Sequence, residues 1–179
     1  MGGIWGVSEM FLGSILHLLK IPFRGVILTA IGFFLMLSLK KMVPRFGSIM
    51  LAGIIVICFK FISPNPYLSN IIMAILLEII FWEVILHLIK NIFLSSIICA
   101  IYTGILCTFT SLLGYMVFGG MNISNAYSAY MKQVLLFTDK LGLSFNPLLI
   151  YLILNVTLTI VLFMTVSLQS KLLLKRFHG

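Results

Sequence analysis

Six long apolar runs, bounded by proline, glycine, asparagine or basic residues, dominate this sequence. They cover roughly residues 4–19, 25–39, 47–62, 68–89, 92–118 and 148–168. Runs of this kind are typical of helices that cross the bilayer core, which is about 30 Å thick. All 5 prolines fall between the runs, where a missing backbone N–H does not interrupt a helix. We therefore predict an all-α integral membrane protein, in which residues 1–179 form one compact bundle of six transmembrane helices.

The composition excludes a water-soluble domain and a nucleic-acid-binding protein. Hydrophobic residues make up 61% of the 179 residues and charged residues 9%, which is more apolar surface than a soluble domain of this size can bury. The net charge is +8, but the basic residues mostly flank the apolar runs and form no nucleic-acid motif. The 3 cysteines lack the spacing of a metal site, so we predict no metal and no cofactor. No cleavable signal peptide is apparent.

The basic residues also predict the orientation of the chain. Of the 12 Lys and Arg residues, seven lie in the N-terminal segment, the second and fourth loops and the tail, and five lie in the other connections. The positive-inside rule then places both termini in the cytoplasm and the protein in the cytoplasmic membrane of the cell. In the longest connection, apolar residues recur at helical spacing over 126–141. This pattern predicts an amphipathic helix at the outer interface, or a lid over the bundle.

The first apolar run contains an acid near mid-depth. Gly2, Gly6, Glu9 and Gly13 share one face of the predicted helix, because successive residues turn by about 100°. Glycines on one face let another helix approach closely, so Glu9 is expected to face protein rather than acyl chains. Two interpretations are open. Glu9 is either a protonated or ion-paired acid that joins two helices, or a group that binds a ligand or an ion.

The fourth run contains a second mid-depth acid, Glu78, and Trp82 follows one helical turn later. A carboxylate beside an aromatic plane suits a planar, hydrogen-bonding ligand, and the alternative is simple packing of Trp82 in the bundle. Glu83, His87 and Lys90 occupy the opposite face of the same helix. Their spacing predicts a self-neutralising cluster rather than a metal site.

Basic residues toward the outer surface complete the candidate site. His17 and Lys60, together with Lys20 and Arg24, can attract an anionic or carboxylate-bearing solute there. Snorkelling of long side chains to the interface explains the basic ones equally well. The candidate substrate-binding residues are Glu9, His17, Glu78, Trp82 and Lys60. No zinc-protease, serine-hydrolase or nucleotide-binding motif is present, so no catalytic residue is predicted.

The first third of the chain resembles a known family. The stretch WGVSEMFLGSILHLLKIPFRGVILTAIG, continued by VPRFGSIMLAGI and KFISP, resembles the start of S components of energy-coupling factor (ECF) transporters, in an uncharacterised subfamily. The resemblance implies a six-helix substrate-binding subunit with both termini inside, which imports a vitamin or another micronutrient. It also implies a T-component membrane subunit and two cytosolic ATPase subunits as partners, and no ATPase in this chain.

Many S components place a small-residue motif, A-x-x-x-A, on the first helix, where it faces the T component. The resemblance implies Gly2 and Gly6 as the counterpart, with Gly13 on the same face. In the alternative, this face packs inside the bundle and Glu9 joins the ligand pocket.

Two functions from other classes stay open. The first is a small membrane-embedded enzyme, in which the mid-depth acids and histidines act on a lipid or isoprenoid substrate. The second is a structural or assembly protein of the membrane, in which the acids only lock helices together.

Overall fold

The computed structural model describes residues 1–18, 24–62, 68–117, 120, 122–138 and 147–177. Within these residues the chain forms seven helices and no strand, so the predicted all-α class is confirmed. The helices are α1 (Gly2–Leu18), α2 (Arg24–Met42), α3 (Ser48–Ile62), α4 (Leu68–Leu88), α5 (Ile92–Val117), α6 (Ile123–Thr138) and α7 (Pro147–Phe177). Each predicted span matches one helix to within a few residues, except that α7 continues to Phe177, well beyond the predicted end at 168.

Four of the helices are long and apolar enough to cross a membrane. The qualifying segments within the described residues are Gly25–Met42, Ile71–Leu88, Ile92–Thr110 and Leu149–Ser170. A helix needs about 20 residues to cross a core of about 30 Å. The other two predicted spans form shorter helices, since α1 has 17 residues and α3 has 15. The predicted amphipathic segment forms α6, shifted a few residues toward the N-terminus.

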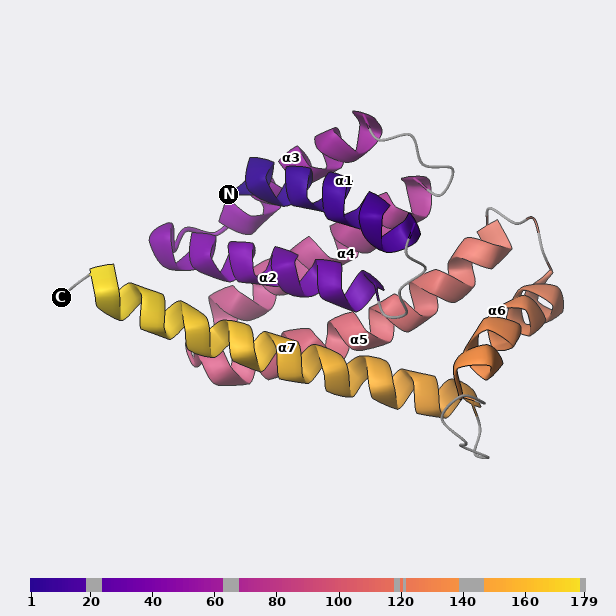
Figure 1. Ribbon diagram of the computed structural model, residues 1–179. Helices are drawn as coiled ribbons and strands as arrows, with labels where there is room; N and C mark the ends of the chain where they lie inside the picture. Colours follow the sequence, from indigo (N-terminus) through magenta and orange to yellow (C-terminus); the bar gives the residue numbers. More distant parts are fainter. Residues whose placement is uncertain (19–23, 63–67, 118–119, 121, 139–146, 178–179) are drawn as a thin grey trace.

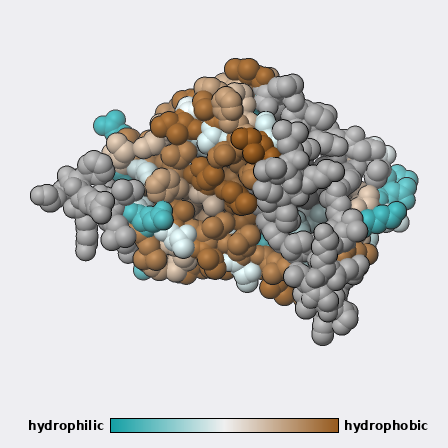
Figure 2. Space-filling model, viewed as in Figure 1, coloured by the Kyte–Doolittle hydropathy of each residue, from teal (hydrophilic) through white to brown (hydrophobic). Residues whose placement is uncertain are grey.

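The bundle has two distinct ends. Consecutive helices from α1 to α5 run in alternating directions, and α7 returns so that its end lies at the same end of the bundle as the start of α1 (Figure 1). We call this the N/C end, and it also holds the end of α2 and the start of α3. At the opposite end, here the α6 end, helix α6 contacts α5 and α7. Figure 2 shows apolar surface over the middle of one face, with hydrophilic residues toward both ends.

Aromatic rings from four helices fill the centre of the bundle. Trp5 of α1 stacks on Trp82 of α4, with ring centroids 6.0 Å apart. Phe33 of α2 meets the edge of Trp82 at 5.4 Å and stacks on Phe163 of α7 at 4.0 Å. The Trp5 ring lies against Gly32, where a Cβ atom would come within 2.6 Å of it. Because all four rings are fully or almost fully buried, they form the core that separates the two ends.

The glycine face of α1 packs inside the bundle, against α3. A Cβ atom at Gly2 would lie 2.8 Å from the backbone oxygen of Ala52, and one at Gly6 would lie 2.8 Å from the Phe59 ring. Such close approach maximises van der Waals contact, which drives helix association where burial of apolar surface gains little. Within the described residues, α3 occupies the face that carries Gly2 and Gly6, in line with the alternative in which this face packs inside the bundle.

Candidate functional site

Glu9 and Lys60 form an ion pair inside the bundle, between α1 and α3. The Lys60 ammonium lies 3.0 Å from Glu9 Oε2 and also donates to the Glu9 carbonyl oxygen at 3.4 Å. Glu9 is 6% exposed and Lys60 is 7% exposed, which confirms that Glu9 faces protein. Gly13, one turn beyond Glu9, lies beside the ammonium, and a Cβ atom there would lie at an ordinary contact distance of 3.8 Å from Nζ.

The partner of Lys60 was not predicted. The sequence places Lys60 toward the outer surface, where it would attract a solute or snorkel, and the structure directs its side chain into the bundle, to Glu9. The physical reason is the attraction between opposite charges at low dielectric, which outweighs the tendency of a lone lysine to seek the interface. Removal of either partner of a buried ion pair leaves the other charge buried without compensation, which strongly destabilises the fold.

Glu78 of a third helix, α4, is 3% exposed and lies within electrostatic range of Glu9. Among the described residues, no hydrogen-bond donor contacts its carboxyl group. Tyr102 and Cys107 of α5 lie within electrostatic range of Glu78. We call Glu9, Lys60 and Glu78 the three-charge cluster, which brings together three of the five predicted substrate-binding residues.

Trp82, the fourth predicted residue, does not add to the cluster. Trp82 is fully buried in the aromatic core, and its indole N–H donates to Thr103 Oγ1 at 3.2 Å. This arrangement favours the packing interpretation of Trp82 over a ligand-stacking surface, because its polar atom is already satisfied. The side chain of His17 lies outside the described part of the chain.

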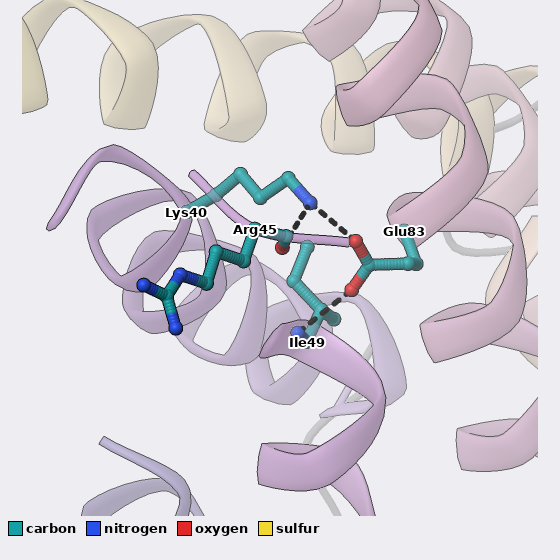
Figure 3. Close-up of polar contacts among 4 residues, drawn as sticks. All are labelled: Lys40, Arg45, Ile49 and Glu83. Atoms are coloured by element: carbon teal, nitrogen blue, oxygen red, sulfur yellow. Dashed lines mark hydrogen bonds and ion pairs between the residues drawn. The ribbon is translucent and has the colours of Figure 1, made fainter. Parts of the chain in front are cut away.

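A second charged cluster lies at the N/C end and was not predicted. Glu83 of α4 is fully buried and forms an ion pair with Lys40 of α2. Its other carboxylate oxygen accepts a hydrogen bond of 2.8 Å from the backbone N–H of Ile49, in the first turn of α3. Lys40 also donates to the carbonyl oxygen of Arg45, at 3.0 Å (Figure 3). One carboxylate therefore ties together α2, α3 and α4.

The predicted cluster of Glu83 with His87 and Lys90 is wrong. Glu83 bonds to neighbouring helices, whereas His87 is exposed with its ring 5.2 Å from that of Phe46, and Lys90 is exposed. The free N–H groups and the positive dipole end of α3 attract the carboxylate more strongly than exposed cations one turn away in its own helix. One signal in the sequence could have predicted the ion pair of Glu83 with Lys40: the two residues carry opposite charges and lie at a similar predicted depth in different spans.

Within the described residues, no three His, Cys, Asp or Glu side chains lie close enough together to hold a metal ion. Two hollows lie away from the three-charge cluster. One is at the N/C end beside Lys40 and Lys90, and the other is an apolar groove between α2 and α7 beside Phe34 and Leu162.

No protein-family model, curated protein or solved structure matches this chain. The assignment of a function accordingly depends on the residues themselves and on the resemblance described above.

Proposed function

We propose that this chain is the substrate-binding membrane subunit of an energy-coupling factor importer, in which the three-charge cluster binds the solute. The observation behind the proposal is Glu78, a carboxyl group inside an apolar bundle with no hydrogen-bond donor among the described residues. Acids buried in membrane helices cost free energy and mark solute or ion sites by default. The resemblance of the N-terminal third to S components supports the same function.

The topology that goes with this function has six crossings. In it, α1 and α3 also cross the membrane, at sites where the bilayer thins, and α6 lies at the outer interface. Six crossings bring both termini to one side, in keeping with the start of α1 and the end of α7 at the same end of the bundle (Figure 1). The positive-inside rule makes that side the cytoplasm. A T component and two cytosolic ATPases would then supply the energy for import, since this chain has no nucleotide-binding loop.

The cluster favours a small solute that donates hydrogen bonds. A donor or a cationic group on the solute would satisfy Glu78, and a solute carboxylate would compete with Glu9 for Lys60. A vitamin or related micronutrient with both kinds of group fits this chemistry. Because the three side chains are nearly fully buried, a solute reaches them only when the helices around them separate.

Replacement of Glu78 by glutamine tests the proposal. The wild-type protein, extracted gently from its own membrane, is expected to retain a small molecule that native mass spectrometry detects. Glu78→Gln keeps the shape but removes the charge-assisted hydrogen bond, which contributes about 1.5–3 kcal/mol, so we expect retention to fall about 10- to 100-fold. Thr157→Val is the matched control, because Thr157 is exposed and its hydroxyl bonds only to its own helix.

Three outcomes would contradict the proposal. A wild-type protein without retained solute, in which Glu78→Gln changes only the thermal midpoint, would favour the structural alternative. Equal retention by the Glu78 variant and the wild type would exclude the three-charge cluster as the site. Formation of a product from a lipid or isoprenoid by the purified chain without any ATPase would favour a membrane-embedded enzyme.

A further inference from the structure

The two acids of the three-charge cluster lie on the same side of the aromatic core. Trp5 of α1 stacks on Trp82 of α4, and the two helices run in opposite directions (Figure 1). Glu9 follows Trp5 by about one helical turn, whereas Glu78 precedes Trp82 by about one turn. Both carboxyl groups are therefore displaced from the tryptophan pair toward the α6 end, and the two rings lie between them and the N/C end.

The charges of this cluster do not cancel. Glu9 and Glu78 each bring a carboxylate, and Lys60 is the one cation among the described residues that contacts either of them. Tyr102 and Cys107 of α5, within electrostatic range of Glu78, bring a phenol and a thiol. The ion pair at the N/C end is balanced within itself and lies beyond the tryptophans. Two carboxylates and one ammonium leave an excess of one negative charge.

The ammonium of Lys60 is already bound to Glu9. It lies 3.0 Å from Oε2 of that residue and donates to its backbone carbonyl oxygen at 3.4 Å. An anionic group of a solute could reach the ammonium only by displacing Glu9, which would leave a carboxylate buried without compensation. Glu78 needs no such exchange, because no donor among the described residues contacts its carboxyl group. The excess charge of the cluster therefore favours a cation beside Glu78.

We propose that the solute of this site carries a basic nitrogen, protonated at neutral pH, and that this cationic group pairs with Glu78. A protonated amine or amidine brings several N–H donors, so it satisfies both the charge and the acceptor oxygens of the carboxylate. The inference rests on the proposed transport function. It narrows the solute from any hydrogen-bond donor to an organic cation, or to a zwitterion whose cationic end meets Glu78.

Native mass spectrometry of the protein, freshly extracted in mild detergent, tests the charge of the retained solute. We expect a molecule whose mass and fragments show a basic nitrogen. An excess of ethylammonium should displace it from the wild-type protein, whereas an equal excess of acetate should not. Glu78→Gln should weaken retention about 10- to 100-fold and remove the effect of ethylammonium. Thr157→Val, at an exposed position of α7, should respond to both probes as the wild type does.

Removal of the lysine distinguishes a cationic solute from an anionic one. Lys60→Met increases the excess negative charge of the cluster, so we expect a cationic solute to be retained at least as tightly as in the wild type. A solute held by Lys60 through a carboxylate would be lost instead. Glu78→Gln tests the inference even if Lys60→Met fails to fold, because Glu78 has no described donor to lose.

The outcomes separate this inference from the transport function. A retained molecule without a basic nitrogen, or one that acetate displaces and ethylammonium does not, would overturn the inference and leave the transport function in place. Loss of the solute from a folded Lys60→Met variant would do the same. A wild-type protein that retains no molecule would contradict the transport function itself, and the inference with it.

Discussion

Replacement of Glu83 by glutamine is expected to lower the free energy of unfolding by about 3 kcal/mol. The variant keeps the volume of the side chain but leaves the ammonium of Lys40 buried without a counter-charge. It also weakens the hydrogen bond from the Ile49 N–H, at the first turn of α3. For a chain of this size the loss corresponds to a fall of about 6–12 °C in the thermal midpoint, measured on the protein in neutral detergent.

A double-mutant cycle isolates the ion pair from the rest of the site. Lys40→Met alone should destabilise by a similar amount, because it leaves the Glu83 carboxylate buried without its cation. The combination of Lys40→Met and Glu83→Gln should recover most of the loss, since a buried pair replaced by uncharged groups of similar volume is often close to neutral. Destabilisation by the double variant equal to the sum of the two single variants would show that the charges do not act as a pair.

Replacement of Gly104 by leucine is expected to cost about 3 kcal/mol, by forcing α5 away from α7. A Cβ atom at Gly104 would lie 2.8 Å from the backbone Cα of Val156, and a backbone atom cannot move aside as a flexible side chain does. Overpacking of this kind typically costs 1–3 kcal/mol, and leucine adds three further carbon atoms beyond Cβ. The nearby buried hydrogen bond from Asn155 to Thr108, 3.0 Å long, should be lost as the helices separate. Thermal unfolding in neutral detergent measures the effect.

Gly3 provides the matched control for this substitution. It is also a helical glycine, in α1, but nothing lies within 4 Å of a Cβ atom placed there. Gly3→Leu should therefore change the thermal midpoint little, or raise it slightly through the higher helix propensity of leucine. If both leucine variants lowered the midpoint equally, the close contact between α5 and α7 would not be the cause.

The positions of the helices were predictable from the sequence, because apolar runs and prolines mark helix ends without any knowledge of neighbouring elements. The number of crossings was less predictable. α1 and α3 are short for a bilayer, and their length alone does not decide whether they cross it. The amphipathic helix α6 was also foreseen, since its pattern of apolar residues is local.

The candidate site was foreseen only in part. Glu9, Glu78 and Lys60 each stand out in the sequence, but for separate reasons, and the pairing of Lys60 with Glu9 was not predicted. For Trp82 the sequence left open a place beside a ligand or packing in the bundle, and its ring packs against Trp5 in the core. These residues come from helices that are distant in the sequence, so their contacts depend on how the helices pack.

The sequence by itself determined that this protein is a helical chain suited to lipid and, to within a few residues, where most of its helices begin and end. That information is local, since it lies in the hydrophobicity, the helix breakers and the spacing of each segment. Only the tertiary structure decided which charges meet: Glu9 with Lys60, and Glu83 with Lys40. The physical reason is that a buried charge is stabilised by whichever opposite charge or free N–H group packing brings within a few ångströms, and sequence separation does not measure that distance.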